Sequence, residues 1–375
     1  MGFISPLFEG PAGLARDLKF NVVLASPRPS GKQLFFAVWY STDMKNSIKF
    51  ISAAIPILFA AYVGIQLFVP GPIGNKQIEV EIPEGSTFKQ ALAILEENNL
   101  IRDRNLFIIM GRVAGLDRRI RAGYYSFLGT MSPWEVFTQL RDGRIVYYEI
   151  TIVEGESLLE IGSRLSSKKI VSRDAFDRLV KDKDFLTTLD INAPSLEGYL
   201  FPQTYKFPKG ASPESVLKIM VQEMRREFTD QMQTRMREMG WTENDVLTLA
   251  SIIEREAATD EERPVISAVY HNRINRGMPL QADPTAIYGV KSYKDKITKD
   301  DLRKETAFNT YVIKGLPPGP IASPGIKSIT AALYPADVPY LYFVAKKDGT
   351  HYFSKTFSEH ASAIRRVKEA HADES

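Results

Sequence analysis

The chain has 375 residues and no cysteine, which excludes disulfide bonds, thiolate metal sites and cysteine nucleophiles. Only four histidines are present, and none of them forms an HExxH or comparable metal-ligand spacing. The GxSxG nucleophile motif, the phosphate-binding glycine loop and the GxGxxG motif are missing as well. We therefore expect no metal ion and no cofactor, and serine hydrolysis and nucleotide chemistry lose most of their support.

Excess charge is also nearly absent, because 48 basic residues face 45 acidic ones and the net charge is +3. A balance this even argues against a nucleic-acid partner. Hydrophobic residues make up 44% and charged residues 25%, which is a globular composition. The side chains left to carry chemistry are therefore carboxylates and aromatics.

One apolar run, residues 50–69, contains no charged side chain and is long enough to cross a membrane as a helix. We predict a transmembrane helix over residues 48–69. A buried core helix is the first alternative, but it would be shorter and would show a polar stripe. A cleaved signal peptide is the second, but no small-x-small site follows the run.

The charges that flank this run predict its orientation. Lys45 and Lys49 precede it, whereas residues 70–75 beyond it carry no charge, so the amino end should stay in the cytoplasm. We interpret residues 1–47 as a short cytoplasmic tail or as an extension ahead of the true start of translation.

An internal repeat follows at an offset of 70 residues. Ile82-Pro83-Glu84-Gly85 recurs as Ile152-Val153-Glu154-Gly155. Each copy predicts a strand, a Glu-Gly turn and an amphipathic helix. Such units occur in small carbohydrate-binding modules and also as plain scaffolds, and both interpretations stay open. We assign the repeat to a module over residues 78–190 and the remaining residues, 195–375, to one further domain.

The strongest single element is a predicted helix over residues 242–257, with a capping box at its start. At about 100° per residue, Glu254 and Glu256 lie at opposite edges of its buried stripe, about 160° apart, and Arg255 faces solvent. A carboxyl group held against apolar surface suits a general acid. The alternative is that each glutamate pairs with an arginine such as Arg263 or Arg273. Helix geometry leaves both open.

A series of motifs in the second half of the chain resembles the MltG/YceG-like endolytic murein transglycosylases. The similarity covers residues from about 80 to 370, and its motifs occur in the order of that family. They are Leu196–Pro202, Ala250–Glu256, His271-Asn272-Arg273, Leu280–Gly289, Asn309-Thr310-Tyr311, Gly315–Gly325 and Gly349–Glu359. So many motifs in series make a chance likeness improbable.

The resemblance implies an α+β fold in which one amino-terminal transmembrane helix precedes a LysM-like module and a YceG-like catalytic domain. It implies a single-pass protein of the bacterial inner membrane, with a periplasmic catalytic domain that acts on peptidoglycan strands beside the peptidoglycan synthases. The family's catalytic glutamate falls on Glu254. One departure is Gln203, where many relatives have an acidic residue, so a carboxylate there is not essential in this chain.

Polar and aromatic side chains suit the recognition of sugar hydroxyls and the stacking of sugar rings, and we expect such contacts from Gln281, Asn309, Tyr311, Glu197 and Tyr199. The alternative is that side chains of this kind simply belong to the core. The implied reaction cleaves the bond between MurNAc and GlcNAc and closes a 1,6-anhydro ring, for which one carboxyl group suffices. The alternative function is a non-catalytic, membrane-anchored scaffold that binds peptidoglycan.

Overall fold

The structure is a computed structural model that describes residues 44–113, 115 and 120–372. The interpretation of residues 1–43 therefore lies outside the described residues. The first element is α1 (Met44–Phe68), a helix with Pro56 inside it. Within the described ranges it is the one helix long and apolar enough to cross a membrane, over Ile51–Phe68, and none of that window is buried. The expected apolar helix is confirmed as a candidate span.

The first copy of the repeat belongs to a small hydrophobic core of its own. This core is built from β1 (Gln77–Ile82), α2 (Phe88–Glu97), α3 (Arg104–Val113), β2 (Gly123–Leu128) and α4 (Pro133–Arg141). Strands β1 and β2 pair antiparallel, with Val80 opposite Tyr125. The apolar face of α2 follows the expected helical spacing, because Phe88, Ala91, Leu92 and Leu95 are its buried residues.

The rest of the described chain forms a larger mixed domain. Its elements are β3 (Tyr147–Thr151), α5 (Leu158–Ser167), α6 (Arg173–Leu179), α7 (Lys183–Thr188), β4 (Thr204–Pro208), α8 (Pro213–Glu227), α9 (Asp230–Glu238), α10 (Glu243–Glu256), η2 (Asp260–Glu262), α11 (Arg263–Asn275), α12 (Asp283–Ile287), η3 (Asp301–Arg303), α13 (Ile326–Leu333), β5 (Tyr342–Ala345), β6 (His351–Ser354) and α14 (Phe357–Ala372). Two antiparallel strand pairs accompany the helices: β3 pairs with β4, which follows three helices later in the chain, and β5 forms a hairpin with β6. Helices and strands are mixed, as the α+β expectation requires.

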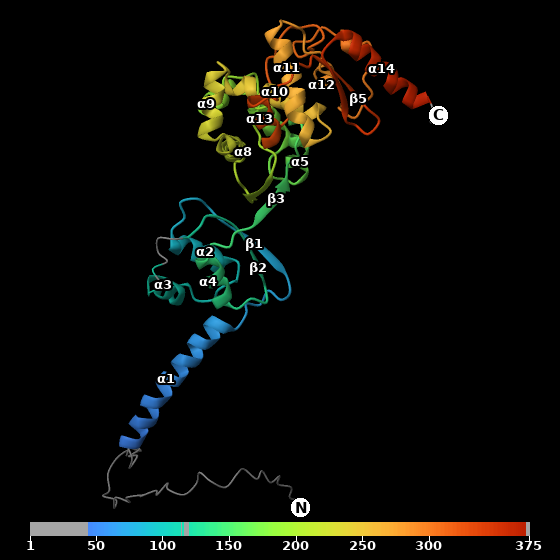
Figure 1. The fold of residues 1–375 in the computed structure, drawn as a ribbon. Coiled ribbons are helices and arrows are strands. Elements are labelled where there is room, and N and C mark those ends of the chain that lie inside the picture. Colours follow the sequence, from blue (N-terminus) through green and yellow to red (C-terminus); the bar gives the residue numbers. More distant parts are fainter. Residues whose placement is uncertain (1–43, 114, 116–119, 373–375) are drawn as a thin grey trace, which may run out of the picture. The chain divides into compact units, whose positions relative to one another are not determined.

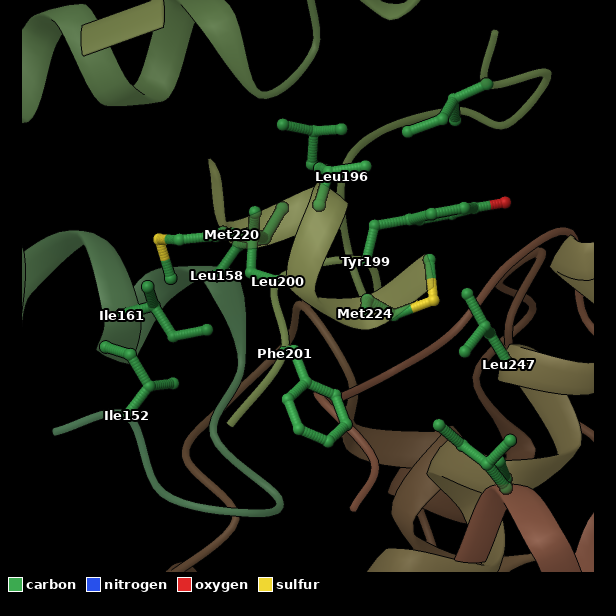
Figure 2. Close-up of a cluster of buried hydrophobic side chains, with 14 of the residues drawn as sticks. Ile152, Leu158, Ile161, Leu196, Tyr199, Leu200, Phe201, Met220, Met224 and Leu247 are labelled. Carbon is green, nitrogen blue, oxygen red and sulfur yellow. The ribbon is translucent and has the colours of Figure 1, made fainter. Parts of the chain in front are cut away.

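The second copy of the repeat packs into this larger core. Figure 2 shows Ile152, Leu158 and Ile161 of that copy in one cluster with Tyr199, Met220 and Leu247. The first hydrophobic core ends at Ile145 and the second begins at Ile150, so the two copies contribute to different cores. The domain boundary near residue 195 stays a prediction. Both copies carry an apolar helix face, and such a face does not specify which core covers it.

Helix α10 lies at the centre of the larger domain and packs against α11, α12 and α13 (Figure 1). Its residues from Val246 to Ile253 are all buried. The expected capping box is present, since the Thr242 side chain accepts from the Asp245 N–H and Asp245 accepts from the Thr242 N–H. This packing holds the last turn of α10, with Glu254 and Glu256, in a fixed position.

Candidate active site

Glu254 is held in an ion pair at the end of α10. Its side chain is 6% exposed, and its Oε1 lies 3.0 Å from Nη1 of Arg263, the first residue of α11. The N–H of Gly325 donates to its Oε2 at 2.9 Å. Of the two interpretations left open by helix geometry, the pairing with Arg263 is therefore present.

Glu256 faces the other side of the helix, as its position two residues further on predicts. It accepts from the Tyr270 hydroxyl at 3.3 Å and from the N–H of Asp283, the first residue of α12. Burial, with the charge of Asp283 as the next contribution, raises the pKa of Glu256 to about 8. The two glutamates thus do not share one reacting centre.

Arg255 does not face solvent, which corrects the expectation from helix geometry. Its guanidinium lies 4.0 Å from the centre of the Tyr293 ring, and its Nη1 donates to the Gly155 carbonyl at 3.3 Å. The expectation failed because the second copy of the repeat packs over this face of the helix. Periodicity within α10 carries no information about that distant segment.

The Pro/Gly segment from Gly315 to Gly325 runs past Glu254 and also covers the core. The Ile321 N–H donates to the hydroxyl of Ser251 on α10 at 3.0 Å. The residues of the Pro/Gly segment from Pro320 to Gly325 are buried. Further backbone hydrogen bonds join it to the turn of the second copy: Gly155 N–H donates to Ser323 O at 2.8 Å, and Ser323 N–H donates to Glu156 O at 2.8 Å.

The same turn carries a carboxyl group, Glu154, that reasoning from the sequence missed. A Cβ on Gly325, whose N–H donates to Glu254, would overlap the Glu154 carboxyl group, so Glu154 lies near Glu254. Burial and the charge of Glu254 raise the pKa of Glu154. The charges of Arg263 and Lys327 oppose this shift. The repeat was the available signal, because it marked Glu154-Gly155 as a turn, but it did not indicate what the turn faces.

Three of the expected sugar contacts are buried. Glu197 is 3% exposed, Tyr199 is 2% exposed and Asn309 is fully buried. Glu197 accepts from the Leu158 N–H at 3.0 Å and from the Tyr288 hydroxyl at 2.8 Å, and burial raises its pKa to about 8. The Asn309 amide donates to the Lys304 carbonyl at 2.7 Å. Tyr199 and Asn309 thus expose almost nothing to a ligand, whereas Glu197 lines the cavity described below, and the contact of these three residues with a sugar stays a prediction.

The two remaining residues lie together on the Glu256 side of α10. Gln281 is exposed, has a φ of +52° and accepts from Arg273 Nη1 at 3.4 Å. The Tyr311 hydroxyl donates to Asp283, which is also exposed. A positive φ in a residue other than glycine is a strained conformation of a kind often found at ligand sites. This pair therefore stays available for substrate binding.

Two further features bear on the chemistry of this region: a cavity, and the arrangement of the side chains that could bind a metal ion. A cavity of about 410 Å³ is lined by Glu197, Tyr288 and Tyr293 but not by Glu254. Among the described residues, no cluster of three histidines, aspartates or glutamates is arranged to hold a metal ion. The chemistry that this part of the chain offers is acid–base chemistry by carboxyl groups, with Glu254 on one side of α10 and Glu256 on the other.

Carboxyl-based sites of this kind are typical of enzymes that cleave glycans. The model of the YceG-like family matches residues 80–366, and the chain belongs to that family. It is 32% identical over 302 residues to an endolytic murein transglycosylase of Bacillus subtilis, with 76% of this chain and 83% of that protein covered.

Two further matches, one in sequence and one in structure, are consistent with this family. An endolytic murein transglycosylase of Streptococcus pneumoniae is 28% identical over 318 residues, which are 76% of this chain but only 57% of the streptococcal protein. The crystal structure of a YceG-like protein from Listeria monocytogenes matches with a TM-score of 0.53 at 32% identity, over 76% of this chain and 98% of that one.

Proposed function

We propose that this protein is an endolytic murein transglycosylase, which cleaves within peptidoglycan strands. The observation that carries the proposal is the family membership together with relatives of that name at 32% and 28% identity. The alternative of a non-catalytic scaffold is not favoured, because these relatives are named as enzymes.

The proposed reaction breaks the bond between C1 of MurNAc and the oxygen of GlcNAc. Glu254, as the carboxylic acid, donates a proton to that oxygen as the bond breaks. Its carboxylate then removes the proton of the C6 hydroxyl, and the C6 oxygen bonds to C1 and closes a 1,6-anhydro ring. No water is consumed, so the second carboxylate that activates water in inverting glycosidases is not needed. The two proton transfers leave Glu254 as it began.

Gln281 and Tyr311 are our proposed contacts to the glycan strand, supported by the exposure of Gln281, the partial exposure of Tyr311 and the strained backbone at Gln281. Because they lie on the Glu256 side of α10, they would hold a part of the strand away from the bond that Glu254 cleaves. We further propose a LysM-like, glycan-binding role for the module that contains the repeat, whose first core (residues 77–145) is separate from that of the catalytic residues. A weak pull-down of the full chain onto sacculi that survives Glu254→Gln would support binding outside the catalytic site.

The location that fits this substrate is the bacterial inner membrane. One apolar helix, α1, is consistent with a single-pass anchor. The lysines ahead of it predict a cytoplasmic amino end and hence a periplasmic catalytic domain, close to the peptidoglycan synthases. Protease accessibility in spheroplasts tests the orientation, because only a periplasmic domain is digested from outside.

The deciding experiment is digestion of purified glycan strands by the full chain in detergent, with product ends identified by mass spectrometry. We expect 1,6-anhydroMurNAc ends, produced inside the strands, and their loss in Glu254→Gln. Products with only reducing MurNAc ends would identify a hydrolase instead. Products released solely from strand termini would argue against endolytic cleavage.

A further inference from the structure

Helix α3 carries apolar side chains on two faces, and the first of them packs into the module that contains the first core. Phe107 and Gly111 are the buried residues of this face. A Cβ on Gly111 would overlap the Phe88 ring of α2, so the two helices are in close contact here. This face of α3 is therefore used inside the protein.

The second face of α3 is mostly exposed. It is formed by residues at the helical spacing i, i+3, i+4 and i+7, namely Leu106, Ile109, Met110 and Val113. At about 100° per residue, the middle of this face is turned about 110° away from Phe107. Ile109 is 60% exposed and Val113 is 86% exposed. We call these four residues the outer face of α3, and an exposed apolar stripe of this kind is typical of a surface that binds an apolar partner.

Contacts with the end of α1 fix the position of α3. The Tyr62 hydroxyl of α1 donates to Asp103, the residue before α3, at 2.7 Å. Arg102 donates to the carbonyl of Pro70, just beyond α1, at 2.7 Å. Leu67 of α1 packs against the first core, to which α3 also contributes. The start of α3 and the last turns of α1 therefore belong to one packed unit.

The contact with Tyr62 places the start of α3 at the depth of a membrane interface. Tyr62 lies inside the apolar window Ile51–Phe68, six residues before its end, which is about 9 Å along a helix that rises about 1.5 Å per residue. A helix that lies on a membrane buries its apolar face about 5–10 Å into the boundary between headgroups and acyl chains. A membrane that α1 crosses over this window therefore also reaches the start of α3.

The charges around the outer face match those of a lipid surface. Arg102, Arg104 and Arg112 are exposed on or just before α3. Of the nearby acidic side chains, Asp103 accepts from Tyr62, and Glu96 pairs with Arg104 at 3.8 Å. Exposed arginines beside an apolar stripe favour anionic phospholipid headgroups, which attract the basic side chains of interfacial helices.

We infer that the outer face of α3 is a lipid-binding surface. It lies in the interface of the bilayer that α1 crosses, and it gives the module with the first core a second contact with that bilayer. The inference goes beyond the proposed reaction and rests on the proposed role of α1 as a membrane anchor. Because the outer face and the Phe107 face are on the same helix, lipid contact there holds the module at the membrane surface.

The absence of cysteine allows a direct test, because a single introduced cysteine carries the one thiol label of the chain. We label Val113→Cys with a fluorophore in the full chain and reconstitute it into vesicles of phosphatidylethanolamine and phosphatidylglycerol. Half of the preparations contain lipids with brominated acyl chains, which quench a fluorophore on contact. The label at position 113 should lose most of its fluorescence in the brominated vesicles.

Two positions with the same exposed fraction serve as controls. Phe59, inside the apolar window of α1, and Leu159, on α5 of the larger domain, are each 66% exposed. A label at Phe59→Cys should be quenched and a label at Leu159→Cys should not. Adding Ile109→Asp to the labelled Val113→Cys chain should remove most of the quenching, because a charge on the outer face is costly to bury in lipid. Ile109 is mostly exposed, so thermal unfolding should stay the same.

The inference is overturned if the label at position 113 is quenched no more than the label at position 159 while the label at position 59 is quenched. In that case the anchor and the proposed reaction both stand. A label at position 113 that is shielded from aqueous iodide but not quenched by brominated lipid, and only at high protein density, would identify a second copy of the chain as the partner and also overturn it. If the label at position 59 is not quenched, α1 is no anchor and the inference falls with it, whereas the digestion of glycan strands still tests the reaction.

Discussion

In the first copy of the repeat, the turn at Glu84-Gly85 has nothing within 4 Å of the position where a glycine Cβ would lie. In the second copy, the same position at Gly155 faces Arg255 and Glu254. Locally the copies are alike, since both turns have a glycine with a φ near +80° and both helices begin with a capping box. The difference teaches that one local unit serves as a surface turn or as part of the proposed catalytic site, depending only on what packs against it.

The helix faces of the two copies have diverged to match their surroundings. Leu92 fills the first core, whereas its equivalent Gly162 lies against the Phe176 ring with no room for a side chain. The copies are therefore no longer interchangeable, although their hydrophobic spacing is the same. The predictions below test this comparison, beginning with the largest expected effect.

Glu254→Gln should slow cleavage about a thousandfold, because loss of a general acid–base group removes about 10² to 10⁴ of rate. It should also lower stability at pH 7 by about 1–3 kcal/mol, since Arg263 loses one of its two charged partners, Asp260 being the other, in a buried setting. Rates on glycan strands and thermal unfolding check the two parts. A variant as active as the wild type would place the chemistry away from the second copy.

Exchange of the two equivalent helix residues should damage both cores. Gly162→Leu forces a side chain into the Phe176 ring, whereas Leu92→Gly leaves a cavity and a flexible position in the helix. Each variant should therefore lower the free energy of unfolding by about 3 kcal/mol or more. Chemical denaturation measures the loss. Leu159→Ala is the control, because Leu159 is 66% exposed and its truncation should change stability by less than about 0.5 kcal/mol. Tolerance of Gly162→Leu would show that the copies are interchangeable after all.

Glu256, on the side of α10 away from the second copy, should affect stability through pH. Its pKa is raised from 4.5 to about 8, so the folded state favours the protonated form. The stability that this provides is complete below pH 4.5 and is lost as the pH rises through 8. Glu256→Gln should therefore be more stable than the wild type by about 1–3 kcal/mol at pH 8, with no difference near pH 4. Unfolding curves at both pH values check this, and a destabilised variant at pH 8 would contradict the buried, protonated state.

The smallest effect is expected from alanine at the two turn glycines. A side chain on a residue with a φ near +80° lowers the free energy of unfolding by about 1–2 kcal/mol. Gly85→Ala and Gly155→Ala should therefore lower stability equally. Only Gly155→Ala should also slow cleavage, because the new side chain would contact Arg255 and Glu254. Parallel unfolding and activity measurements separate the two effects. Equal activity of both variants would show that the second turn does not influence the site.

The sequence by itself determined the features that depend on local spacing. Charge and hydropathy identify α1, the offset of 70 residues identifies the repeat, and helix periodicity separates Glu254 from Glu256 on α10. Helix caps and turn glycines could be predicted from the sequence for the same reason, because the residues that form them lie within four positions of one another.

Only the tertiary structure decided what each of these units contacts. Glu254 binds the N–H of a residue 71 positions away, and Arg255 binds a carbonyl 100 positions away. The enclosure of Tyr199 and Asn309, the partner of Arg255 and the approach of Glu154 all depend on such contacts. Their cause is the burial of apolar faces against one another, which is non-directional and leaves no periodic mark in the sequence to say which faces meet.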